Sequence, residues 1–180
     1  MKCAICANIE HFLKIYESCL YADTKLDIVL LIGNCGSNSK QYFQRQLNFA
    51  RNVIHSLTLN PQNVRFAIIS VSSGAEIVQV LKKQPDNLIA VPSASLPSGG
   101  LCTFGQGIDK AHELLKNNRI SGILQVMISL LDGKSDDDVS KPASELSKAG
   151  VLLYAVGSKE KVGEYVASNI TSDPDRKSVV

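Results

Sequence analysis

The chain alternates short apolar runs with amphipathic segments. Residues 27–32, DIVLLI, form a continuous β-branched and leucine-rich run, which is typical of a strand buried on both faces of a parallel sheet. Similar runs predict further strands at residues 64–71, 75–81, 123–131, 151–156 and 178–180. Apolar residues at spacings of three and four predict helices at residues 39–57, around Ile108, Ala111 and Leu115, from Val139 through Ala143 and Leu146 to Ala149, and at residues 160–168.

Strands separated by helices imply βαβ units with right-handed crossovers. We therefore expect an α/β fold with a doubly wound, mostly parallel sheet and helices on both of its faces. The Ser-Ser-Gly turn at residues 72–74 joins two apolar runs directly and predicts an antiparallel hairpin strand at one edge. Residues 84–100 carry three prolines and two adjacent glycines, which predicts a loop. Gly150 is expected to end the preceding helix.

Composition limits the function classes. With 180 residues and 44% hydrophobic content, the chain can bury a full core without a metal or a disulfide. A formal net charge of +2, with no basic cluster among aromatics, argues against nucleic acid as a partner. No segment reaches the roughly 20 apolar residues of a membrane span. Polar and charged residues interrupt the apolar stretch within residues 1–25, so we interpret this part as a leader or a short helix.

The turn after the first strand, residues 33–39 (GNCGSNS), lies where ligands bind in open α/β sheets, and it contains no acidic residue. Gly33 and Gly36 permit tight turning, and Ser37, Asn38 or Ser39 can cap the next helix. The turn lacks the GxGxxG pattern of a dinucleotide-binding enzyme, and no acid follows the second strand near residue 72. The three histidines lie far apart without a serine or cysteine at a motif spacing, so no catalytic histidine is expected.

Five segments, in order, resemble signatures of a von Willebrand factor A domain: DIVLLIGNCGSN, VRFAIISVSSGAEI, VMISLLDGKSDDDV, LSKAGVLLYAVGS and ITSDPDRKSVV. The resemblance covers residues 26–180 and is nearest to the A domains of the collagen VI group and related matrix proteins. It implies a sheet wrapped by helices, a secreted extracellular matrix location, and recognition of matrix proteins or collagen chains rather than catalysis. The family's closing C-terminal helix has no counterpart before residue 180, so we expect marginal stability or self-association.

The resemblance carries over the family's metal-dependent adhesion site only in part. Its first loop normally reads Asp-x-Ser-x-Ser, and the matching residues here are Gly33, Cys35 and Ser37. Thr103 and Asp132 match the two later ligand positions. Magnesium prefers octahedral oxygen ligation with one or two carboxylates, so Ser37, Thr103 and Asp132 would make at most a weak magnesium site, and no cofactor is expected. Ser37 as a helix cap and Asp132 as an acceptor for loop amides are the alternatives.

These expectations define a binding rim made of residues 33–39, 98–105 and 132–135. Its candidate contact residues are Gly33, Asn34, Cys35, Ser37, Ser39, Thr103 and Asp132. The expected function is a non-enzymatic protein–protein interaction module of an extracellular matrix or cell-adhesion protein, with a degenerate metal site. An intracellular A-type scaffold domain for complex assembly is the alternative, because no signal peptide is visible. Asn169, in the triplet Asn-Ile-Thr, is a candidate N-glycan acceptor that is compatible with secretion.

The sequence has five cysteines. Cys3 and Cys6 form a single CxxC pair with Cys19 downstream, which is weak evidence for zinc and leaves their pairing undetermined. The resemblance places Cys35 and Cys102 in the two loops that flank the metal position, where either a disulfide or two buried thiols would fit. The acidic run at residues 136–138 lacks the spacing of a calcium loop, so we interpret it as a solvated helix start.

Overall fold

The computed structural model describes residues 25–35, 40–57, 63–83, 101–131, 133–157, 169–171 and 177–179. Several predicted features lie outside the described residues: the segment before residue 25, the loop at 84–100, the helix at 160–168, Cys3, Cys6, Cys19, Gly36, Ser37, Asn38, Ser39 and Asp132.

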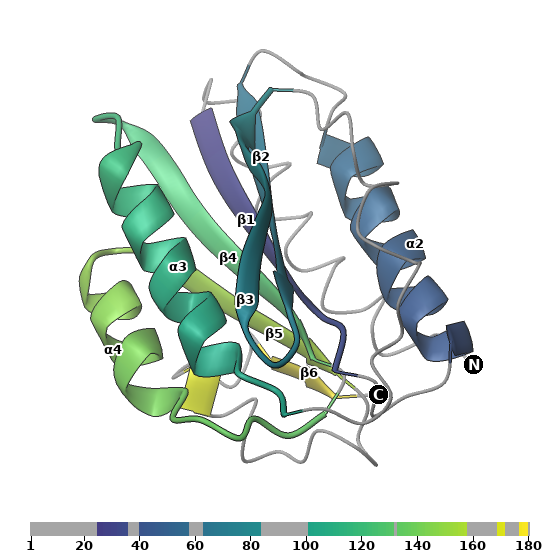
Figure 1. Ribbon diagram of the computed structural model, residues 1–180. Helices are drawn as coiled ribbons and strands as arrows, with labels where there is room; N and C mark the ends of the chain where they lie inside the picture. The colour runs from purple at the N-terminus through teal and green to yellow at the C-terminus, as the bar shows by residue number, and fades with distance from the viewer. Residues whose placement is uncertain are drawn as a thin grey trace.

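Six strands form one sheet in the order β3-β2-β1-β4-β5-β6 (Figure 1). Their bounds are β1 Lys25–Gly33, β2 Val64–Val71, β3 Ala75–Lys82, β4 Ile123–Leu131, β5 Leu152–Gly157 and β6 Lys177–Val179. Every neighbouring pair is parallel except β2 and β3, which form an antiparallel hairpin at one edge. The predicted mostly parallel sheet with one antiparallel edge strand is therefore confirmed.

Helices cover both faces of the sheet, as predicted: α2 (Lys40–Leu57) covers one, and α3 (Phe104–Asn117) with α4 (Ser140–Lys148) covers the other (Figure 1). Strand β1 shows why its sequence is apolar throughout. Ile28, Leu30 and Ile32 belong to the core beneath α2, whereas Val29 and Leu31 belong to the core beneath α3 and α4. A strand whose alternate side chains enter two different cores has no polar face.

The observed helices and strands differ from the predicted ones only in their first or last residues. Ala149, which we predicted to lie in the apolar stripe of α4, follows the helix as its C-cap, and Gly150 adopts φ +87°. This left-handed conformation confirms Gly150 as the residue that ends the helix. Strand β3 runs one residue beyond its predicted end, and two register shifts interrupt its pairing with β2. Such irregularities are common in edge strands.

A buried ion pair joins β1 and β2 near the amino ends of these strands. The guanidinium of Arg65 donates from Nε and Nη2 to the two carboxylate oxygens of Asp27, at 2.7 and 2.6 Å. Asp27 is fully buried, Arg65 is partly exposed, and the two residues face each other in the strand register. The hydrogen bond to Asp27 is the main cause that raises the pKa of Arg65 above its usual value.

Arg65 also donates to the backbone carbonyl of Asn118, just past the end of α3. The ion pair therefore fixes that end of α3 against the sheet, on the side away from the predicted binding rim. Among the described residues, no helix combines the length and the apolar character that crossing a bilayer requires.

Candidate functional site

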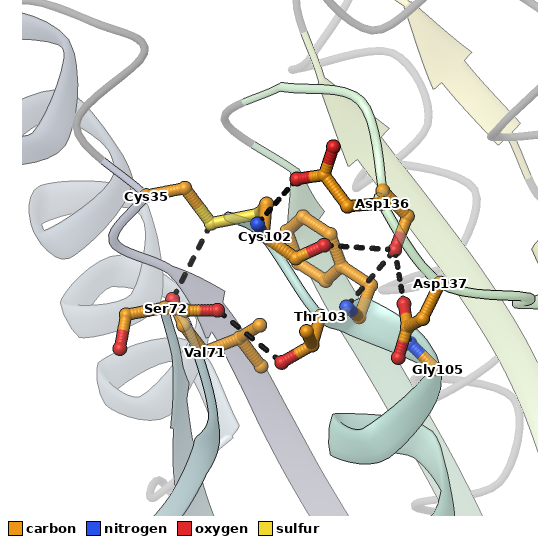
Figure 2. Close-up of a disulfide and its surroundings, with 10 residues drawn as sticks. Cys35, Val71, Ser72, Cys102, Thr103, Gly105, Asp136 and Asp137 are labelled. Atoms are coloured by element: carbon orange, nitrogen blue, oxygen red, sulfur yellow. Dashed lines mark hydrogen bonds between the residues drawn. A yellow bond between two sulfur atoms is a disulfide. The ribbon is translucent and has the colours of Figure 1, made fainter. Parts of the chain in front are cut away.

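Three loops meet at the carboxyl edge of the sheet, next to β1 and β4, where the order of the strands reverses. One follows β1 and contains Asn34 and Cys35. The second, residues 101–103, leads into α3, and the third, residues 133–139, leads into α4. Figure 2 shows how their side chains and backbone groups face one another. The structure thus brings together the described parts of the predicted binding rim.

Cys35 and Cys102 form a disulfide, with Cα atoms 5.3 Å apart and a sequence separation of 67 (Figure 2). The sequence left two alternatives for this pair, a disulfide or two buried thiols, and the structure contains the disulfide. Both cysteines are buried, and Cys35 Sγ lies 3.6 Å from the carbonyl oxygen of Val71. A disulfide sulfur carries no hydrogen, so this approach is a packing contact. The bond joins the loop after β1 to the loop before α3.

The loop before α3 is also attached to the end of β2. Thr103 donates to the carbonyl of Ser72 twice, from its backbone N–H at 3.0 Å and from its hydroxyl at 3.3 Å. The backbone N–H of Asn34 donates to Val71 at 2.7 Å. Thr103 is buried, and its hydroxyl is directed to a neighbouring loop. A predicted metal ligand is thus engaged in holding the loops together.

Asp136 binds the backbone of Cys102 in both directions. Its carboxylate accepts from the Cys102 N–H at 2.6 Å, and its own N–H donates to the Cys102 carbonyl at 2.7 Å. This pair of bonds places the loop after β4 directly beside the disulfide. All three loops of the site are therefore connected, two by a covalent bond and the third by backbone hydrogen bonds.

The first turn of α3 receives its hydrogen-bond acceptors from the same loop. Asp137 accepts from the backbone N–H groups of Gly105 and Gln106, each at 2.9 Å. The hydroxyl of Ser135 accepts from the N–H of Phe104 at 3.0 Å and donates to Asp137 at 2.6 Å. These contacts satisfy three of the N–H groups that a helix N-terminus leaves without an intrahelical partner.

The prediction that residues 136–138 form the solvated start of the next helix was wrong for two of the three aspartates. Only Asp138 serves α4, by accepting from the N–H of Ser140 at 2.9 Å. Asp136 and Asp137 bind the loop before α3 and its first turn. The sequence shows that the first turn of α3 contains no acidic residue, and the structure adds that its N-cap Thr103 makes no side-chain capping bond. Its N–H groups therefore require an acceptor from elsewhere.

Gly105 allows this close approach. A Cβ at this position would overlap the carbonyl oxygen of Asp138 and lie 2.8 Å from the Asp137 carboxylate. Gly107, two residues further along α3, faces Val71 and Leu31. A Cβ at this position would lie 2.6 Å from a methyl carbon of Val71 and 2.8 Å from a methyl carbon of Leu31. The two glycines let α3 pack against both the acidic loop and the sheet.

The described residues do not fit a divalent cation. Gly33 has no side-chain oxygen, the sulfur of Cys35 is in the disulfide, and the Thr103 hydroxyl binds Ser72. Asn34 has a buried side-chain oxygen without a hydrogen-bond partner, but one neutral oxygen does not supply the carboxylate ligation that magnesium prefers. Within the described ranges, no three His, Cys, Asp or Glu side chains gather as a metal site would need.

The rim presents one large apolar side chain to solvent. Leu101 is 64% exposed, directly before the buried Cys102. Its sequence context gives no signal for this position, because an isolated leucine at the end of a loop has no periodic pattern. Exposed apolar side chains are common on protein surfaces, but this one lies on the edge of the sheet where open α/β folds bind ligands.

Comparison with known proteins identifies the family. The model of the von Willebrand factor type A domain matches residues 27–180. Cuticlin-6 of Caenorhabditis elegans is 29% identical over 84% of this chain and 27% of its own length. The collagen alpha-4(VI) chain of Mus musculus is 29% identical over 76% of this chain and 6% of its own. The collagen alpha-1(XII) chain of Notophthalmus viridescens is 31% identical over 83% of this chain and 16% of its own length.

Solved structures share the fold. Proximal thread matrix protein 1 from the mussel byssus superposes with a TM-score of 0.77 at 19% identity, over 87% of this chain and 44% of that one. The manganese-loaded TRAP protein of Plasmodium vivax gives a TM-score of 0.72 at 16% identity, over 88% of this chain and 69% of that one. The chain spans about a quarter or less of the length of the curated relatives named above. The family match covers most of the chain, and the chain belongs to the von Willebrand factor type A domain family.

Proposed function

We propose that the chain is a non-enzymatic protein–protein interaction module of an extracellular matrix or cell-adhesion protein, and that its rim binds a matrix protein or collagen chain without a metal ion. The rim comprises residues 33–39, 98–105 and 132–135, and its candidate contact residues are Gly33, Asn34, Cys35, Ser37, Ser39, Thr103 and Asp132. Family membership and the names of the relatives, which include collagen VI and collagen XII chains, support the matrix setting.

The Cys35–Cys102 disulfide is the observation that carries this proposal. It joins two loops at the position where other family members hold a metal between loops, and one of its cysteines replaces a serine ligand. A metal site of the family type would need oxygen ligands from both loops. Here the loops are held by a covalent bond and by the Asp136 and Thr103 hydrogen bonds, so a rigid rim does not depend on a cation.

The disulfide also supports a secreted location. Structural disulfides persist in oxidising compartments and are rare in the cytosol, where thiols are kept reduced. An intracellular scaffold domain would gain no stability from this pair of cysteines. The disulfide therefore favours the extracellular module over the intracellular alternative.

Leu101 is the most suitable contact for testing the rim. Exposed apolar anchors at the centre of an interface contribute most of the binding free energy in many complexes. Ile120 provides a matched control, because it is also a large exposed apolar residue, 49% exposed, but it follows the far end of α3. The variants Leu101→Asp and Ile120→Asp both replace an exposed apolar side chain by a carboxylate, and they do so at opposite edges of the sheet.

The experiment measures binding of the secreted chain to immobilised collagen VI and to an interstitial collagen, in magnesium and in EDTA. We expect equal binding in both buffers, a loss of about tenfold or more with Leu101→Asp, and no loss with Ile120→Asp. Binding that vanishes in EDTA would contradict a metal-independent rim. Absence of binding to either collagen would contradict the assigned partner class.

A further inference from the structure

A groove of about 350 Å³ lies beside α4, and its lining includes the first and last residues of this helix, Ser140 and Lys148. One wall consists of Ser140, Ser144 and Ser147 of α4 with Lys148 at its end, and Asn169 lies on the other. Serines at these spacings share one helix face. The volume is that of a small-ligand pocket, and serine hydroxyls and the Lys148 ammonium line it together with the apolar side chains of Ala143 and Ile170.

Asn169 begins Asn-Ile-Thr, which is the only Asn-x-Ser/Thr triplet in the whole sequence. The next two residues belong to the core: Ile170 and Thr171 are only 1% and 4% exposed. Asn169 itself is half-buried and lines the groove. Ile170 and Thr171 thus anchor the triplet in the core, whereas Asn169 lines the groove beside α4.

We propose, building on the secreted location argued above, that Asn169 carries an N-linked glycan and that the first sugars of this glycan lie in the groove against the serine face of α4. Sugar hydroxyls are donors and acceptors, and the three serine hydroxyls and the Lys148 ammonium are groups that pair with them. No described residue forms a hydrogen bond with the side chains of these three serines. A glycan in this place covers part of α4.

The modification is a group transfer in the secretory pathway, with an oligosaccharide carried on a polyprenyl diphosphate as the co-substrate. The side-chain nitrogen Nδ2 of Asn169 forms a bond to the anomeric carbon of the first N-acetylglucosamine. The bond between that carbon and the diphosphate oxygen breaks, and its electron pair leaves with the lipid diphosphate. The amide proton that Asn169 loses passes to a base of the transferase.

Site occupancy is the first test. The full chain is expressed behind a signal peptide in a eukaryotic secretory host, and its mass is measured before and after peptide N-glycosidase. Secreted and cell-retained chains are both measured, because transfer precedes folding and occupancy then does not depend on correct secretion. We expect a glycan on the wild type and on Thr171→Ser, and none on Asn169→Gln or Thr171→Ala. A wild-type chain without a glycan overturns the proposal, whatever the outcome of the collagen binding assay.

The position of the glycan is the second test. Lys148 lines the groove, whereas Lys110 is an exposed lysine of α3 that does not. We expect an amine-reactive label to modify Lys148 severalfold more slowly in the glycosylated wild type than in Asn169→Gln, with Lys110 labelled at the same rate in both. Equal labelling of Lys148 in the two proteins would show that the sugars do not lie against α4 and would overturn that part of the proposal.

Discussion

The carboxylate of Asp137 caps α3 by accepting the backbone N–H of Gly105, 32 residues before it in sequence, at 2.9 Å. It also accepts from the backbone N–H of Gln106 and from the hydroxyl of Ser135. A negative charge at a helix N-terminus is favourable because the helix dipole and the unpaired N–H groups both attract it. The same contact ties the loop after β4 to α3, and so contributes to the shape of the rim.

Asp137→Ala should lower the free energy of unfolding by about 1–2 kcal/mol, the range for losing a helix cap. Asp137→Asn should cost less, because one amide oxygen remains as an acceptor. Asp109→Ala, in the exposed middle of α3, is the control and should change stability by about 0.5 kcal/mol or less. Urea unfolding measures all three. Equal stability of Asp137→Ala and Asp109→Ala would contradict the capping role.

Gly105→Ala should destabilise the protein more than Gly74→Ala. The added methyl group at position 105 would overlap the backbone carbonyl of Asp138, which cannot move without disturbing the start of α4. At position 74, a Cβ meets no atom within 4 Å. We expect a loss of about 1–3 kcal/mol for Gly105→Ala, as for overpacked sites, and little change for Gly74→Ala. Thermal unfolding of the two variants measures the difference, and a stability for Gly105→Ala at or above the wild type would show that the loop adapts freely.

Breaking the Asp27–Arg65 ion pair should be costly, while replacing both residues should cost much less. Arg65→Met leaves the fully buried Asp27 carboxylate without its partner, which typically costs about 3–5 kcal/mol. The double variant Asp27→Leu with Arg65→Met removes both charges, so much of the stability should return. Urea unfolding of the two single variants and the double variant gives the coupling free energy. Additive losses would contradict a direct interaction.

The raised pKa of Arg65 fixes the pH dependence of its contribution. A cation whose pKa is higher in the folded state adds stability at every pH below its unfolded pKa, and that stability is lost only as the pH rises through the folded pKa. The pKa of arginine in the unfolded chain already lies far above neutral pH. We therefore expect no change in stability from Arg65 titration between neutral pH and mildly alkaline pH.

The fold was predictable because it depends on local patterns. The uninterrupted apolar run of β1 indicates a strand buried on both faces, and the spacing of Ile108, Ala111 and Leu115 indicates the buried face of α3. Gly150 was predictable for the same reason, since its role depends on its immediate neighbours.

The site was predictable only where the family resemblance supplied long-range information. The resemblance placed Cys35 and Cys102 in adjacent loops, although their sequence separation is 67. The partner of Asp137 was not predictable, because three consecutive aspartates before a helix suit that helix equally well. The Asp27–Arg65 pair was missed because it depends on the register between two strands, which periodicity does not specify.

Millimolar magnesium or manganese should leave the melting temperature of the wild-type chain unchanged. A ligand stabilises by RT ln(1 + [L]/Kd), so a site with very weak affinity gives a negligible shift. Adding Gly33→Asp to the pair Cys35→Ser and Cys102→Ser should create a magnesium-dependent shift, and the two serine substitutions alone are the control. A wild-type shift that disappears in Asp132→Ala would show that the site binds metal after all.

Removing the Cys35–Cys102 bond should lower the free energy of unfolding by about 4 kcal/mol, the value for a closed loop of 67 residues in the chain-entropy model. The test is cleanest in a background with Cys3, Cys6 and Cys19 replaced by serine, because only one pair is then left to reduce. In this background, dithiothreitol should lower the urea midpoint to that of the added double variant Cys35→Ala and Cys102→Ala, and should have no effect on the double variant itself. Both cysteines are buried, so reduction should be slow in native buffer and fast in urea. Non-reducing peptide mapping that finds both thiols free in the secreted chain, or an unchanged midpoint after full reduction, would contradict a stabilising disulfide.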